Sequence, residues 1–396
     1  MFTNIRIINK DKLKGVFFGQ AIGDALGLGT EFVTQTEVRK HYPHGLNDYS
    51  QIIQDYHRSR WEKGSWTDDT DMMLCIAESI VKNKEVNLAD IAQNFKQWFL
   101  QNPMGIGRHT YKVLCLGDYT EKPQQAAELV WNMSGKKSAS NGAVMRTSVV
   151  GLLKKDVEKH AAAICRLTHA DPRCVGASVI ISLVIHSLVY EEQLLPLEIL
   201  IETGRKYDER IEPYLKLVQA EALEELDLDD EINIGYTLKT MAAGLWCVYH
   251  APSFEEGLLA VVNEGGDADT NGAVAGSLLG AKYGYDAIPP RYIEGLKHKD
   301  ILWRIIRKKK NAFKNRGCLK TELRQPLILY SRKQLSILQV NHLITLAGRL
   351  HQFVQELLRI SRTVKRSGIA CFGTYQLAIL YPFHYPVVIA HNEELA

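Results

Sequence analysis

Apolar residues recur at three- and four-residue spacing along most of the first 300 positions, which is the pattern of helices with one buried face. No run of alternating β-branched residues is long enough to predict a sheet. The helices expected from this spacing cover residues 12–28, 71–82, 88–99, 124–133, 156–167, 174–190, 236–249, 254–263 and 271–283. The fold class predicted is therefore all-α, with many short helices joined by marked turns.

Two of these expected helices carry glycines at every fourth position. The first row is Gly19, Gly23 and Gly27, and the second is Gly272, Gly276, Gly280 and Gly284. Glycine inside a helix costs about 1 kcal/mol relative to alanine. A row along one face therefore indicates that another backbone approaches that face closely, as in a tightly packed helical core.

The longest apolar stretch, residues 175–189, is interrupted by Ser178, Ser182, His186 and Ser187. A membrane span needs about 20 mostly apolar residues, so this stretch predicts a buried core helix and no membrane partner. The seven cysteines form no Cys-x-x-Cys pair, and the first residues lack the apolar segment of a secretory signal. We expect a cytoplasmic protein with reduced cysteines.

Charge is distributed unevenly along the 396 residues, whose net charge is +3. Residues 300–396 hold 16 Lys+Arg and 5 Asp+Glu, a net charge of +11, so the preceding residues are acidic. We expect a helical domain over residues 1–315 and a basic C-terminal extension over residues 316–396. The basic run 307–310 could contact nucleic acid, but no nucleic-acid motif accompanies it, and a solvated helix end is the favoured interpretation. The oligomeric state is not indicated.

Two clusters of carboxylates and hydroxyls each open an expected helix. One is Gly-Ser-Trp-Thr-Asp-Asp-Thr-Asp at 64–71, and the other is Asn-Glu-Gly-Gly-Asp-Ala-Asp-Thr-Asn at 263–271. Every candidate ligand in them is an oxygen, which favours hard cations such as Mg²⁺, Mn²⁺ or Ca²⁺ over zinc. Helix N-capping is an equally good explanation of residues 67–69 taken alone. If the clusters converge, they could hold two cations roughly 3.5–4 Å apart.

Three further segments suit a pocket. Residues 23–31 end a helix in a glycine-rich loop that carries Glu31. Residues 138–146 form a small-residue loop whose backbone N–H groups favour phosphate. His169 follows a helix, where a structural hydrogen-bonding role is favoured over a ligand role.

Taken together and in this order, these segments resemble the ADP-ribosylglycohydrolase family. The matching pieces are residues 19–31, 66–70, 141–146, 167–172 and 265–272, so the resemblance covers roughly the first 300 residues. It implies an orthogonally packed all-α catalytic domain with a cleft for two Mg²⁺ or Mn²⁺ ions. It also implies hydrolysis of the bond between ADP-ribose and an acceptor, so the expected partner is ADP-ribose or an ADP-ribosylated substrate.

The resemblance assigns roles to particular residues. Those implied as metal ligands are Thr67, Asp68, Asp69, Asp267, Asp269 and Thr270. Those implied to lie along ADP-ribose are Ser138, Ser140, Asn141, Gly142 and His169, although many relatives have glycine where Ser140 stands. Glu31 is expected as general base and Asp269 as a second catalytic residue, with Asp24 and Asp71 in supporting roles.

Two other functions stay open at this point. One is a non-catalytic ADP-ribose-binding relative, and the other is a two-metal hydrolase of nucleotide phosphate esters. The acceptor, which could be arginine, serine, a nucleobase or a small molecule, is also open. We expect its binding residues among 56–61 and 105–111, because these segments lie between the motifs.

Overall fold

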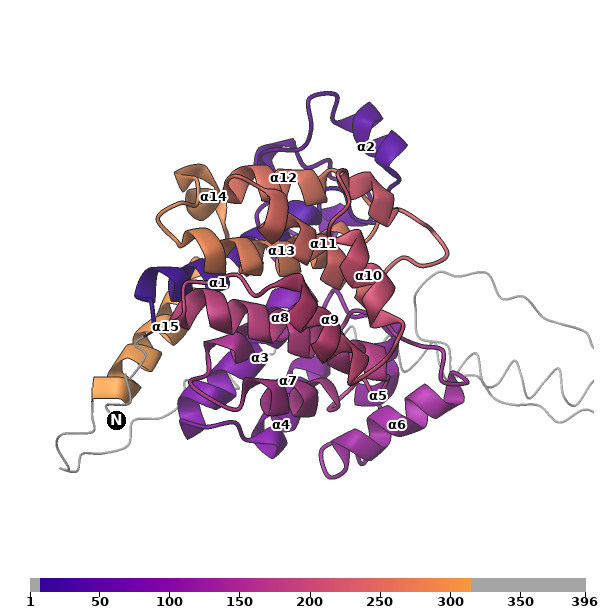
Figure 1. Ribbon diagram of the computed structural model, residues 1–396, viewed down its shortest axis with the longest axis vertical. Helices are drawn as coiled ribbons and strands as arrows, with labels where there is room; N and C mark the ends of the chain where they lie inside the picture. Colours follow the sequence, from indigo (N-terminus) through magenta and orange to yellow (C-terminus); the bar gives the residue numbers. More distant parts are fainter. Residues whose placement is uncertain (1–7, 315–396) are drawn as a thin grey trace, which may run out of the picture. The chain divides into compact units, whose positions relative to one another are not determined.

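The computed structural model describes residues 8–314, and within this range the chain is helical with no strand (Figure 1). The predicted basic extension, 316–396, lies outside the described residues. The helices are α1 (Lys10–Gly27), α2 (Gln35–His41), α3 (Asp68–Asn83), α4 (Leu88–Leu100), α5 (Arg108–Leu114), α6 (Pro123–Met133), α7 (Val157–Cys165), α8 (Pro172–Tyr190), α9 (Leu197–Arg205), α10 (Ile211–Leu217), α11 (Thr237–His250), α12 (Phe254–Val262), α13 (Ala268–Tyr283), α14 (Pro290–Gly295) and α15 (Lys299–Lys314). All nine expected helices form, and α2, α5, α9, α10, α14 and α15 are additional.

Helices α1 and α13 lie against each other in the middle of the described domain, and their glycine rows face one another (Figure 1). A Cβ placed on Gly23 would lie 1.9 Å from the carbonyl oxygen of Gly272. A Cβ on Gly19 would lie 2.1 Å from the carbonyl oxygen of Gly276. The two backbones therefore touch, as the four-residue glycine spacing predicts, and only glycine fits at these crossings.

Helix α8 is the only helix in the described part of the chain long and apolar enough to cross a membrane, and 83% of its most apolar window is buried inside the protein. It packs against α7, α11 and α13, as expected of a core helix. The five described cysteines, at 75, 115, 165, 174 and 247, are all unpaired thiols.

The N-termini of α3 and α13 differ from ordinary capped helix starts. Thr67 and Asp267 occupy the N-cap positions, yet neither side chain accepts a hydrogen bond from its own helix. N-capping therefore does not explain these two residues. Their oxygens are free for contacts with other segments, and those contacts build the site described next.

Candidate functional site

Carboxylates from α1, α3, α13 and the loop after α1 converge on one place. Asp24, Asp69 and Asp269 each offer an oxygen, and these three oxygens lie within 4.8 Å of one another. Glu31, Asp267 and Asp269 form a second group with the same spacing. Asp269 belongs to both groups, which we call the first and second trios. The two acidic clusters of the sequence thus meet at one site, as the two-cation hypothesis requires.

Burial makes this concentration of negative charge costly. It is the largest cause that raises the pKa of Asp24 to about 7, of Asp68 to about 8 and of Asp267 to about 6. The pKa values of Asp69 and Asp269 are raised well above the ordinary range by burial first and by neighbouring carboxylates next. Such a group is stable only when protons or cations neutralise it.

Asp69 carries the clearest sign of a missing partner. Its Oδ1 atom is buried and has no hydrogen-bond partner. Its Oδ2 atom lies 3.1 Å from the Thr67 hydroxyl. A buried, unpartnered carboxylate oxygen beside other carboxylates, with no nitrogen or sulfur in either trio, fits a hard divalent cation. The residues present therefore suit Mg²⁺ or Mn²⁺.

Asp24 has a more central place than the supporting role predicted from the sequence. Its two oxygens accept four hydrogen bonds, from the backbone N–H and the hydroxyl of both Thr67 and Thr70, at 2.6–3.0 Å. These bonds fix the start of α3 to α1. Asp24 also contributes an oxygen to the first trio, whereas Asp71 lies in neither trio and accepts from the indole N–H groups of Trp66 and Trp98.

The other expected ligands lie at the edge of the trios. Thr67 Oγ1 is 3.5 Å from Asp269 Oδ2, and the Thr270 backbone N–H donates to Asp269 Oδ1 at 2.7 Å. Asp68 is half-buried and belongs to neither trio. Its Oδ1 atom lies 2.7 Å from the position a Cβ would take on Gly105. The segment 105–111, expected at the rim, therefore borders Asp68.

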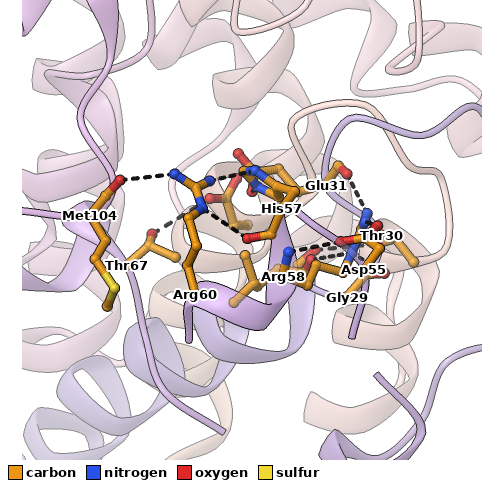
Figure 2. Close-up of polar contacts among 12 residues, drawn as sticks. Gly29, Thr30, Glu31, Asp55, His57, Arg58, Arg60, Thr67 and Met104 are labelled. Carbon is orange, nitrogen blue, oxygen red and sulfur yellow. Dashed lines mark hydrogen bonds and ion pairs between the residues drawn. The ribbon is translucent and has the colours of Figure 1, made fainter. Parts of the chain in front are cut away.

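Glu31 is brought to the second trio by a loop that is fixed on two sides, and Figure 2 shows one of them, the contacts of Arg58. On one side, the Phe32 N–H donates to the Gly266 carbonyl at 2.7 Å, and the Gly266 N–H donates to the Val33 carbonyl at 2.9 Å. Gly266 has φ +65°, a conformation that favours glycine. On the other side, the buried Arg58 guanidinium donates to backbone carbonyls of the loop.

The Glu31 carboxylate is 7% exposed and is held by His57, whose Nε2 lies 2.6 Å from Oε2. Sequence reasoning placed residues 56–61 only at the rim and did not single out this contact. No local sequence pattern predicts the contact between His57 and Glu31, because the two residues are 26 positions apart and are brought together only by the fold.

The loop 138–142 reaches the acidic site through Asn141, whose Nδ2 donates to Asp267 Oδ2 at 2.6 Å. Ser140 Oγ lies 3.0 Å from His169 Nε2, and Ser138 Oγ lies 2.9 Å from His109 Nδ1. A Cβ on Gly142 would lie 3.1 Å from the His169 ring, so this position has little room for a side chain.

His169 itself is buried, and burial lowers its pKa well below the ordinary value. Its Nδ1 lies 2.7 Å from the Thr168 hydroxyl. Burial therefore favours the neutral ring, and both of its nitrogens lie within hydrogen-bond distance of hydroxyls. This agrees with a structural hydrogen-bonding role and still leaves the ring beside the loop expected along ADP-ribose.

Over the described residues the fold is all-α, and the two trios form an oxygen-only group of carboxylates that could hold cations. The family profile described as ADP-ribosylglycohydrolase matches residues 6–318. The chain therefore belongs to the ADP-ribosylglycohydrolase family, and its reaction is the hydrolytic removal of ADP-ribose from a modified acceptor.

Similar proteins match about three quarters of the chain. An ADP-ribosyl-[dinitrogen reductase] glycohydrolase from Rhodospirillum rubrum is 28% identical over 308 residues, covering 73% of this chain and 91% of that protein. An ADP-ribosylarginine hydrolase Tri1 from Serratia proteamaculans is 24% identical, covering 72% and 75%. A solved structure described as an ADP-ribosylglycohydrolase-related protein complex is 27% identical, covers 76% of this chain and 98% of its own, and has a TM-score of 0.57.

Proposed function

We propose that this hydrolase uses two divalent cations, Mg²⁺ or Mn²⁺, with Asp269 shared between them. Asp24 and Asp69 complete the first site, and Glu31 and Asp267 complete the second. The observation that carries the proposal is that Asp269 belongs to both trios. The unpartnered Asp69 oxygen supports it further. Thr67, Asp68 and Thr270 are near enough to add oxygens or to orient the ligands.

When bound, the cations supply positive charge that can hold and orient the two vicinal hydroxyls of the ribose next to the scissile bond. Glu31 takes a proton from the attacking water, whose oxygen forms the new bond to the anomeric carbon. The bond from that carbon to the acceptor breaks, and the proton that Glu31 took from water passes to the acceptor, which leaves Glu31 ionised again. The buried carboxylates stabilise the positive charge that develops on the ribose ring.

The loop 138–142 holds the remainder of ADP-ribose in this proposal. Asn141 connects the loop to Asp267, so the ligand and the second trio are positioned together. Ser138 and Ser140 present hydroxyls that are already oriented by His109 and His169.

We further propose that the acceptor is the guanidinium of an arginine side chain. Support comes from the relatives, since the Tri1 protein from Serratia proteamaculans and a second one from Pseudomonas putida are both named ADP-ribosylarginine hydrolases. The second covers 72% of this chain at 25% identity.

The test measures ADP-ribose released from an ADP-ribosylated arginine peptide with EDTA, Mg²⁺ or Mn²⁺. Wild type is compared with Asp269→Ala and with Asp286→Ala, a control whose side chain is 82% exposed. We expect metal-dependent release that only Asp269→Ala abolishes. Metal-dependent binding of ADP-ribose without release would contradict an arginine acceptor, and liberation of phosphate or AMP would indicate a phosphohydrolase instead.

A further inference from the structure

We propose that His57 is a positioning residue for the Glu31 carboxylate, and that Arg60 fixes the imidazole tautomer this task requires. The inference rests on the proposed function, in which Glu31 takes the proton from water. It adds two residues, neither of them in the trios, to the machinery of the reaction.

The hydrogen-bond partners of His57 determine where its proton sits. Nδ1 lies 2.5 Å from Nη2 of Arg60, and Nε2 lies 2.6 Å from Oε2 of Glu31. A guanidinium only donates hydrogen bonds, so Nδ1 must accept and carries no proton. The neutral ring then has its proton on Nε2 and donates it to Glu31. Arg60 thus selects the tautomer that binds the carboxylate (Figure 2).

The position of Arg60 is itself determined by other contacts. Its Nε donates to the His57 carbonyl at 2.9 Å, and its Nη1 donates to the Met104 carbonyl at 3.3 Å. The guanidinium lies 4.4 Å from the centre of the Trp61 ring, a cation–π distance. These contacts keep the guanidinium against the imidazole on the exposed side of the site.

The imidazole lies between two aromatic rings. Its centroid is 5.3 Å from that of Phe32 and 5.5 Å from that of Trp61. Phe32 has φ +58°, an uncommon and strained conformation for a large side chain. Residues held in such conformations cluster at functional sites. The strain here puts an exposed aromatic side chain beside the imidazole.

Two consequences follow for Glu31. One carboxylate oxygen is held, so the group cannot rotate freely and its other oxygen has a defined direction. The oxygen that is not held by His57 is thereby kept in one direction relative to the second trio. His57 cannot serve as a metal ligand in this arrangement, because neither ring nitrogen has a lone pair left for a cation.

The neighbouring Arg58 has a different task. It donates to the backbone carbonyls of Leu28, Gly29 and Glu31, and thus fixes where the loop runs. His57 fixes how the Glu31 side chain points within that loop. Loss of His57 should therefore change turnover with little effect on the fold, which separates its role from that of Arg58.

The kinetic test uses His57→Phe, which keeps the ring but removes the donor, and His57→Gln, whose amide N–H can replace Nε2–H. The exposed His44→Phe is the matched control. With Mg²⁺ or Mn²⁺ saturating, we expect kcat of His57→Phe to fall roughly 10- to 100-fold, with KM within about threefold of wild type. His57→Gln should recover most of the loss, and His44→Phe should match wild type.

Nitrogen-15 NMR of the imidazoles tests the tautomer directly, with the His57 signal identified from its absence in His57→Gln. We expect the proton on Nε2 in wild type and a mixture of tautomers in Arg60→Ala. A proton on Nδ1 in wild type would overturn the proposal, whether or not the protein turns over.

The kinetic results can contradict either the positioning role of His57 or the proposed function, and the two outcomes can be told apart. If wild type is active and His57→Phe is equally active, or His57→Gln is as impaired as His57→Phe, the positioning role is wrong and the proposed function stands. If wild type releases no ADP-ribose with any metal, the proposed function is wrong. The role of His57 in turnover is then wrong as well.

Discussion

Replacement of Gly23 by alanine tests whether the contact between α1 and α13 sets the geometry of the site. The new Cβ would lie 1.9 Å from the Gly272 carbonyl oxygen, whereas real Cβ atoms essentially never come closer than 3.0 Å. The obstacle is the backbone of a helix, which cannot turn aside as a flexible side chain can. The two helices must therefore separate at this crossing.

The expected loss of stability in Gly23→Ala is the sum of two opposing effects. Overpacking in a core costs about 1–3 kcal/mol of stability. The value expected here is about 3 kcal/mol, because the new Cβ meets a rigid backbone. Alanine regains about 1 kcal/mol of helix propensity over glycine. The net loss is about 2 kcal/mol, which corresponds to a fall in Tm of roughly 3 °C for a domain of this size. Because Asp24 follows Gly23, the separation also displaces the first trio, and a displacement near 1 Å costs about 100-fold in turnover.

The assay measures Tm and ADP-ribose release for Gly23→Ala beside Gly117→Ala. Gly117 is the matched control, since its added Cβ would meet nothing within 4 Å and its φ is not positive. We expect the control to lie within about 0.5 kcal/mol of wild type. If both variants have the stability and activity of wild type, the close contact of the two helices does not set the geometry of the trios.

Three further outcomes are expected. Without metal, the folded pKa of Asp24 is about 7 and that of Asp68 about 8, both above the unfolded value of 3.8, so stability is lost as pH rises through these values. The melting temperature of EDTA-treated protein should be higher at pH 5 than at pH 8, and the reverse order would be inconsistent with buried, unneutralised carboxylates. Arg58→Met removes the donor from the Leu28 and Glu31 carbonyls, whereas the Gly29 carbonyl keeps the Tyr42 hydroxyl, and should lower the free energy of unfolding by about 2 kcal/mol in urea titrations; a loss below 1 kcal/mol would mean that the loop is held by other contacts. Asn141→Ala removes the bond to Asp267 and should weaken Mn²⁺ binding roughly 10-fold or more in calorimetry, a result that unchanged affinity would refute.

Parts of the fold were predictable because they leave a periodic trace in the sequence. The four-residue glycine rows of α1 and α13 identify a backbone contact that the structure confirms. Helices α2, α5, α10 and α14 have only six or seven residues each, too few for a hydrophobic period to be recognised. Helix α14 begins at Pro290, where proline suits a first helical turn.

The site was predictable where its residues are grouped along the chain. The two acidic clusters indicate the carboxylates by local composition alone. N-capping was an equally good explanation of the first cluster. For Thr67 it is removed only by the observation that its hydroxyl accepts no hydrogen bond from the backbone of α3 and donates to Asp24. The place of Asp24 in the first trio and the contact of His57 with Glu31 arise from tertiary structure, and no local pattern marks either of them.

The most direct test of the central claim is a titration of EDTA-treated protein with Mn²⁺ that follows ADP-ribose release from an ADP-ribosylated arginine peptide. If Asp269 is shared by two cations, the metal-free protein is inactive, release reaches its maximum at two Mn²⁺ per chain, and Asp269→Asn loses tight binding of both ions together with activity. Full release from metal-free protein, or saturation at one Mn²⁺ per chain, would contradict the two-cation site.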